Sequence, residues 1–176
     1  KMHIEYIKEN QELYKNFQAT DTVGKLFFVD KSKRLFHVPA PSVSIYNKTP
    51  IVYSFDNIVD YELVVDGETY TKGGASIGRA LVGGAVFGGV GAVIGGTTGK
   101  KSQKEMIKKM YIKITLNHTY DTYTEISLIS ADTKKGSFLY NTMTDCANKI
   151  LALLDSITAE SSAPSFSGSA AFSSSV

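Results

Sequence analysis

The segment GGASIGRALVGGAVFGGVGAVIGGTTG, residues 73–99, decides how the rest of the chain can be arranged. It holds 11 of the 15 glycines in this 176-residue sequence, and no charged residue follows Arg79 within it. Glycine destabilises a water-exposed helix by roughly 1 kcal/mol per residue. Such a composition therefore suits either a flexible loop or a closely packed element.

Small residues recur in this segment at a helical spacing. They form two rows, Ala80, Gly84, Gly88, Ala92 and Gly96, and then Gly91, Gly95 and Gly99. Small side chains at i, i+4 and i+8 let helix backbones approach closely, as in helix pairs within membranes. The apolar side chains expected to make the contacts between these rows are Leu81, Phe87, Val90 and Ile94. The spacing predicts a self-packing glycine zipper.

The composition is that of an ordinary globular chain, with 43% hydrophobic residues and a net charge of +2. This length is enough for one domain with a real core. The single cysteine, Cys146, excludes an intrachain disulfide and fits a reducing compartment. The opening residues KMHIEYIKENQ lack the apolar region of a secretory signal. We therefore expect a location that is cytoplasmic or peripheral to a membrane. Since the sequence does not begin with Met, we also expect either a fragment or an added residue.

Before the glycines, one helix and then strands are expected. An apolar face predicts a helix over residues 1–19, and a period of two from Gly24 predicts a hairpin of 26–29 with 35–38. Asp66-Gly67 is a strong turn signal. The further predicted strands are 51–55, 58–65 and 68–72.

After the glycines, two strands and the clearest helix follow. The strands are predicted at 110–116 and 123–129, and the helix at 138–157. The apolar face of this helix comprises Leu139, Met143, Cys146, Ala147, Ile150, Leu153, Leu154 and Ile157. Beyond it the Ser-rich sequence predicts disorder.

Six or seven antiparallel strands followed by one amphipathic helix indicate an α+β fold, a PH-like barrel whose open end the helix fills. The chain also resembles a family of bacterial and phage proteins with a PH-like core and a glycine-rich insertion, often beside a zinc ribbon or a short oligomerisation motif. The stretches that carry the resemblance are the hairpin around Asp30, FDNIVDYEL (55–63), residues 78–96, and YNTMTDCANKILALLDSI (140–157). The resemblance covers about residues 22–157 and implies no reaction. No CxxC pair is present in this sequence.

The domain boundaries follow from this arrangement. We expect a helix or linker over 1–21, the PH-like domain over 22–158, and a disordered tail over 159–176. About 20 uncharged residues are enough for one membrane span. A single span through 73–99 would, however, place the strands on either side of it across the membrane from one another. A hairpin of two short helices that turns near Gly88 keeps them in one domain.

Three chemical alternatives are weaker. Gly74–Gly78 matches the G-x-S-x-G elbow of serine hydrolases, and Ser76 would need His118 as base and Glu105 as acid. Residues 95–102 resemble a phosphate loop but fail the Walker pattern at two positions. The histidines are far apart and have no cysteine companions, so we expect no metal or cofactor.

Basic residues flank the zipper, and the ones expected to contact lipid headgroups or an acidic partner are Arg79, Lys100, Lys101 and Lys104. Each basic residue beside an apolar element contributes roughly 1 kcal/mol to binding anionic headgroups. The run from Lys100 to Lys109 also fits a solvated entry to the next strand. Because aromatic residues are not interleaved with it, nucleic acid is not the expected partner.

These observations predict a non-enzymatic module that self-associates or contacts a membrane through its glycine zipper. An isolated apolar hairpin is a large exposed patch, and such patches usually mark an interface. The expected partners are further copies of the chain, membrane lipid or another protein. Two alternatives stay open: a soluble homo-oligomeric adaptor without a membrane role, and a small serine hydrolase using Ser76.

Overall fold

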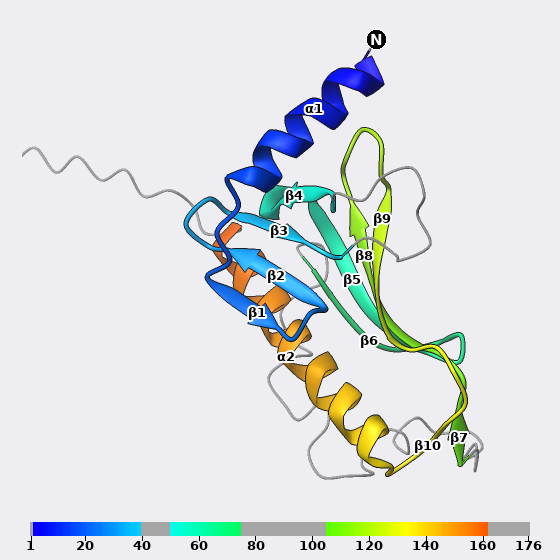
Figure 1. Ribbon diagram of the computed structural model, residues 1–176. Coiled ribbons are helices and arrows are strands. Elements are labelled where there is room, and N and C mark those ends of the chain that lie inside the picture. Colours follow the sequence, from blue (N-terminus) through cyan, green and yellow to red (C-terminus); the bar gives the residue numbers. More distant parts are fainter. Residues whose placement is uncertain (1, 40–49, 75–104, 162–176) are drawn as a thin grey trace, which may run out of the picture.

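The computed structural model describes residues 2–39, 50–74 and 105–161 (Figure 1). In these residues, antiparallel strands form two four-stranded sheets and one two-stranded sheet, with a helix at each end of the described chain. The elements are α1 (Met2–Lys15), β1 (Asp21–Val23), β2 (Phe27–Asp30), β3 (Leu35–His37), β4 (Val52–Ser54), the 3-10 helix η1 (Phe55–Asn57), β5 (Ile58–Val65), β6 (Glu68–Gly74), β7 (Met106–Ile107), β8 (Met110–Leu116), β9 (Tyr123–Ile129), β10 (Thr133–Lys134) and α2 (Phe138–Ser161).

The first sheet has the order β1-β2-β3-β4. Its central hairpin is the one predicted from the period of two, and Val29 of β2 pairs with Phe36 of β3. Both side chains are fully buried. The edge strand β1 was not predicted, because three residues are too few to show a periodic pattern.

Asp30 organises the turn of this hairpin. Its buried carboxylate accepts hydrogen bonds from the Ser32 hydroxyl at 2.6 Å and from the backbone N–H groups of Gln18 and Lys33 at 3.0 and 3.1 Å. Burial alone would raise the pKa of Asp30, but these hydrogen bonds hold the pKa below its usual range. The carboxylate therefore ties the chain after α1 to the β2–β3 turn.

The second sheet has the order β6-β5-β8-β9, and its long strands lie where the sequence predicts them. Along β8, buried and partly exposed residues alternate from Met110 to Leu116, as expected for a strand with one face on the core. The turn between β5 and β6 is at Asp66-Gly67, as predicted, and both residues have positive φ.

The predicted single barrel is not closed in the described residues. The two four-stranded sheets are separate ladders, and η1 leads the chain from β4 into β5. A capping box causes this turn: the Ser54 side chain accepts from the backbone of η1, and the Asn57 side chain accepts from Ser54 N–H at 2.9 Å. The described residues also hold more strands than the predicted six or seven. The additional ones are β1, β7 and β10, which have only two or three residues each and therefore leave no periodic pattern in the sequence.

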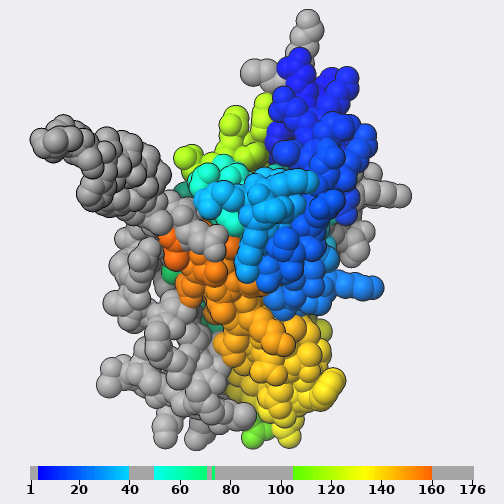
Figure 2. Space-filling model, turned by 90° about the vertical axis from the view of Figure 1, so that its left-hand side faces the viewer, coloured from blue at the N-terminus to red at the C-terminus, as the bar shows by residue number. Residues whose placement is uncertain are grey.

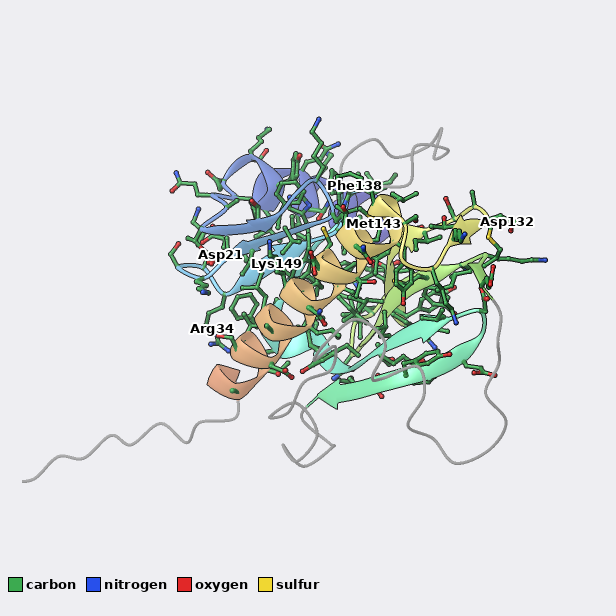
Figure 3. All side chains as sticks on the ribbon, turned by 90° about the horizontal axis from the view of Figure 1, so that it is seen from below. Asp21, Arg34, Asp132, Phe138, Met143 and Lys149 are labelled. Carbon is green, nitrogen blue, oxygen red and sulfur yellow. The ribbon has the colours of Figure 1, made fainter. Side chains whose placement is uncertain are left out.

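Helix α2 packs against elements of both four-stranded sheets (Figures 1 and 3). The residues of its predicted apolar face that are fully or almost fully buried are Ala147, Ile150, Leu154 and Ile157. Leu151 is also buried, although it was not assigned to that face. Leu139 is a correction, because it is 51% exposed. It lies in the first turn of the helix, beyond the sheet surfaces that bury the later turns.

Helix α1 ends at Lys15, earlier than predicted, and packs beside β4. The Asn10 side chain fixes this contact: its amide donates to Pro50 O at 3.0 Å and its oxygen accepts from Val52 N–H at 2.8 Å. Beyond the helix, the Phe17 ring packs on buried His37, which also stacks on Phe28. These contacts give His37 a structural role.

Candidate functional site

All thirteen residues predicted to form the zipper contacts and their basic flank lie between residues 79 and 104. This is within the stretch 75–104, outside the described residues. The predicted helical hairpin therefore stays a prediction. What the structure places is the two points at which the described chain enters and leaves this stretch.

These two points lie at opposite ends of β5. Gly74, the last described residue before the stretch, pairs with Asp60 near the start of that strand. After the stretch, the backbone N–H groups of Lys108 and Lys109 donate to the Asp66 carboxylate at the far end of β5, both at 2.9 Å. Six residues of strand separate these points by about 20 Å. The glycine-rich stretch thus starts and ends on one domain, about the length of a strand apart.

We call Gly73–Gly74, where the described chain leaves β6 for the glycine-rich stretch, the exit point, and the residues from Glu105 to Lys109, where it comes back, the return point. An aromatic ring packs against the exit point. A Cβ atom on Gly73 would lie 2.5 Å from the Tyr61 ring on the neighbouring strand, so only glycine fits there. The Tyr61 hydroxyl donates to the Asp155 carboxylate on α2. Burial, and then the hydrogen bond to Asp155, raises the pKa of Tyr61. Gly73, Tyr61 and Asp155 together link the exit point to β5 and α2.

Exposed apolar side chains lie at the return end of the molecule, and we call this group the tip: Met106 on β7, and Phe138 and Leu139 at the start of α2. Phe138 is 88% exposed and Met106 is 43% exposed. Lys134 of β10 pairs with Met106, and the chain turns from β10 directly into α2 (Figure 1). Figure 3 shows Phe138 at the first turn of α2.

Charged residues surround the tip. The lysines are Lys108, Lys109, Lys134 and Lys135, and the carboxylates are Asp66, Glu105 and Asp132. Lys109 approaches Glu125 at 3.9 Å and lies over the Tyr111 ring. Asp66 is occupied by two backbone N–H groups, so its charge is partly compensated. The tip is therefore apolar, with charged residues of both signs around it.

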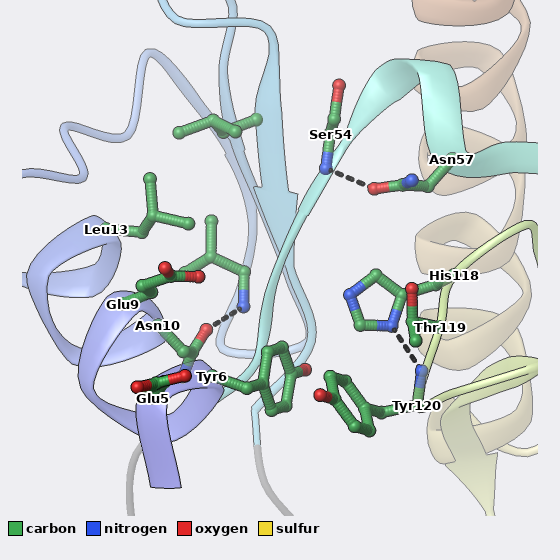
Figure 4. Close-up of a pocket in the computed structure, with 12 residues that line it drawn as sticks. Glu5, Tyr6, Glu9, Asn10, Leu13, Ser54, Asn57, His118, Thr119 and Tyr120 are labelled. Atoms are coloured by element: carbon green, nitrogen blue, oxygen red, sulfur yellow. Dashed lines mark hydrogen bonds between the residues drawn. The ribbon is translucent and has the colours of Figure 1, made fainter. Parts of the chain in front are cut away.

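A cleft lies at the other end of the second sheet, between α1, β4 with η1, and the β8–β9 loop (Figure 4). Its volume is about 460 Å³. The described residues that line it are Glu5, Tyr6, Glu9, Asn10, Leu13, Leu35, Val52, Ser54, Asn57, His118, Thr119 and Tyr120. Figure 2 shows α1 and the start of α2 at opposite ends of the molecule.

One wall of the cleft is a network of rings around Asp121. The Tyr6 hydroxyl donates to Asp121 at 3.2 Å, and its ring lies 4.4 Å from that of Tyr120. Burial, and then the negative charge of Asp121, raises the pKa of both Tyr6 and Tyr53. The Nδ1 atom of His118 accepts from the backbone N–H groups of residues 120 and 121. The network fixes the β8–β9 loop against α1.

The arrangement does not assemble the hydrolase alternative from its expected acid and base. Glu105 precedes β7 at the tip, whereas His118 follows β8 at the cleft. The length of β8 separates them by about 20 Å, and Ser76 lies outside the described residues. Within the described residues, no three or more His, Cys, Asp or Glu side chains are grouped closely enough to hold a metal ion.

Residues 3–130 match the family described as "Glycine zipper containing PH domain". The chain belongs to this family. The match spans the glycine-rich segment and the strands from β1 to β9, and it ends before α2, so the resemblance seen in the sequence is confirmed at the level of the family. A zinc ribbon companion is not shown.

Two relatives of this glycine zipper PH domain are each 32% identical over 120 residues, which is 65% of this chain. One is named an immunity protein of Bacillus phage SPbeta, and the other an SPbeta prophage-derived uncharacterized membrane protein, YomJ, of Bacillus subtilis strain 168. The match spans 59% and 52% of those proteins. No solved structure matches the chain.

Sequence reasoning missed both the tip and the cleft. Met106 was treated only as part of a basic run and Leu139 as a core residue, and Phe138 was not singled out. For the cleft, no local signal exists, because its walls come from four separate segments between residues 5 and 120 of the chain. Among the helices of the described residues, none is long and apolar enough to cross a membrane.

Proposed function

We propose that this glycine zipper PH domain is a non-enzymatic interaction module that contacts a membrane surface from the cytoplasmic side, through its glycine-rich stretch and the tip beside it. The observation that carries the proposal is the exposed tip at the return point of that stretch. Phe138 is the most exposed large apolar side chain in the described residues. An apolar cluster left open to water costs free energy unless a surface covers it.

The geometry of the two attachment points supports the same function. One is on β6 and the other is bonded to Asp66 at the end of β5, about 20 Å away along that strand, so the apolar stretch between them is presented from one domain. Insertion of the tip would bury Phe138 and Leu139, each contributing up to about 1.5–3 kcal/mol. The lysines around the tip would extend their charged ends to the headgroups while their aliphatic stems follow the apolar surface.

The names of the relatives add two expectations. The membrane protein YomJ supports contact of this domain with lipid, and the immunity protein supports binding to a protein partner. The zipper rows, with Gly88 near their centre, would then hold copies of the chain together on the membrane. The soluble homo-oligomer is the competing outcome.

The test measures binding of the full chain to vesicles of equal parts phosphatidylglycerol and phosphatidylcholine, compared with phosphatidylcholine alone. The double variant F138S/L139S should bind roughly tenfold or more weakly. Tyr123→Ser is the matched control, because Tyr123 is 53% exposed on β9, away from the tip. Its binding should equal that of the parent chain.

Light scattering with and without vesicles separates the two outcomes for the zipper. Gly88→Leu should abolish self-association or vesicle binding while the fold, followed by circular dichroism, stays intact. A Gly88→Leu chain with unchanged oligomer size and unchanged vesicle binding would overturn the zipper's role. A parent chain that forms oligomers but binds neither kind of vesicle would establish the soluble adaptor instead.

A further inference from the structure

The cleft beside α1 combines an apolar floor with an acidic rim. Val52, Leu35 and Leu13 supply apolar surface from three different elements. Glu5 and Glu9 stand along the α1 side of the opening, one helical turn apart (Figure 4). Side chains at i and i+4 on a helix are neighbours, so the two carboxylates can act on one ligand group.

The exposed edge of β4 is not available to a partner strand at two of its positions. Asn10 occupies the backbone N–H of Val52, and Asn57 occupies that of Ser54. Side chains that satisfy an edge strand in this way block further strand pairing. A partner at the cleft is therefore recognised through a side chain, and the addition of a backbone strand is disfavoured.

The charges of the lining indicate which side chain fits. None of the twelve described lining residues is a lysine or arginine. Neither Glu5 nor Glu9 forms an ion pair or hydrogen bond with another described residue, whereas Glu12 on the same helix pairs with Lys15 at 2.6 Å. Arg34, in the β2–β3 turn, is held at 3.0 Å by Asp56. The rim thus carries two negative charges that the described residues leave uncompensated.

We propose that this cleft binds a basic side chain, preferably that of an arginine, presented by a protein partner. The aliphatic stem would lie on Leu13 and Val52, and the guanidinium would bridge Glu5 and Glu9. A guanidinium group is planar, offers donors to two carboxylates at once and packs on aromatic rings, and the Tyr6 and Tyr120 rings lie beside the rim. This site is separate from the membrane contact and does not depend on it.

The experiment titrates the full, nitrogen-15-labelled chain with the peptide acetyl-Gly-Arg-Gly-amide and follows backbone amide shifts. The matched probe has citrulline in place of arginine, which keeps the shape and removes the charge. We expect shifts at Asn10, Val52 and Thr119 with the arginine peptide, and much smaller ones with the citrulline peptide. An absence of shifts at the cleft, or equal binding of both peptides, overturns the proposal.

Variants on α1 locate the charge. The double variant E5Q/E9Q should weaken arginine-peptide binding roughly fivefold to tenfold, since an exposed ion pair contributes up to about 1 kcal/mol. Glu12→Gln on the same helix changes the net charge in the same direction but does not line the cleft, so its binding should stay within about twofold of the parent. Equal losses in the two variants would mean that only overall charge matters and would overturn the site. F138S/L139S should bind the peptide normally, so failure of the membrane proposal is recognised separately.

Discussion

The two ends of the second sheet use their side chains in opposite ways. Strand β8 joins them, from Met110 near the tip to Leu116 near the cleft. At the cleft end, polar side chains bond to one another or to the backbone and hold α1 and the β8–β9 loop in place. At the tip end, Phe138 and its neighbours project into water.

The difference indicates two kinds of recognition. A hydrogen-bonded wall keeps its shape without a ligand, so the cleft is preorganised for a directional contact. Exposed apolar side chains gain free energy from any surface that removes them from water, and this gain has no directional requirement. The acidic cleft therefore suits a specific basic group, and the tip suits a fluid lipid surface.

The largest expected effect is at the exit point, where the chain leaves β6 for the glycine-rich stretch. Gly73→Leu should lower the free energy of unfolding by about 3 kcal/mol, because the new side chain would displace the Tyr61 ring and its hydrogen bond to Asp155. Urea denaturation measures this loss. Tyr61→Phe keeps the ring, and should cost only about 1 kcal/mol.

Combining Gly73→Leu with Tyr61→Ala sharpens the test. Removing the ring makes room for the leucine, so the double variant should lose less stability than the sum of the single changes. Strict additivity would show that the ring and the glycine are not in contact, and that this contact does not hold the exit point in place.

A smaller effect is expected where α1 meets β4. Asn10→Ala leaves the Val52 N–H and the Pro50 carbonyl without their side-chain partner, which should cost about 1–3 kcal/mol. Hydrogen exchange at Val52 should accelerate, and the arginine peptide should bind more weakly. Vesicle binding by the tip should not change.

Asn16→Ala is the matched control, because within the described part of the chain that side chain bonds to an exposed carbonyl one turn earlier in α1. Its loss of stability should stay within about 0.5 kcal/mol. If both asparagine variants behave alike, the side chain of Asn10 is not what holds the cleft wall.

The smallest effect concerns acid stability of the first sheet. The pKa of Asp30 is depressed in the folded state, so its stabilisation is present above the ordinary carboxyl pKa of about 3.9 and is lost as the pH falls through the folded value. Asp30→Asn should remove this dependence and flatten the acid limb of a stability-against-pH curve.

Asp132→Asn at the tip end is the control for the substitution itself. Its side chain is exposed, in contrast to that of Asp30, so its loss of stability at neutral pH should stay within about 0.5 kcal/mol. An unchanged acid limb for Asp30→Asn would show that the hydrogen bonds around that carboxylate do not stabilise the fold.

Much of the secondary structure was predictable, and the reason is length. Strands β5, β8 and β9 have seven or eight residues, enough for a period of two to show. Strands β7 and β10 have two residues each and leave no such pattern. The Asp66-Gly67 turn was predictable because its positive φ angles favour these residue types.

The site was less predictable, because the spacing of apolar residues describes a single helix or strand and not its neighbours. It placed Leu139 on the apolar face of its helix, but it could not show that no sheet covers the first turn. Likewise, nothing in the helical pattern of residues 1–19 distinguishes Glu5 and Glu9 from an ordinary solvated helix face. They gained a possible ligand only when α1 was seen beside β4 and the β8–β9 loop.

The sequence by itself determined the family, the order of the long elements and the spacing of small residues from Ala80 to Gly96, because these depend on residue type and short-range period. Tertiary structure decided that Gly73 must be glycine, that the glycine-rich stretch leaves and returns at opposite ends of β5, and that the tip and the cleft lie at opposite ends of the second sheet. Each of these depends on which distant segments meet, and only packing and strand pairing set that.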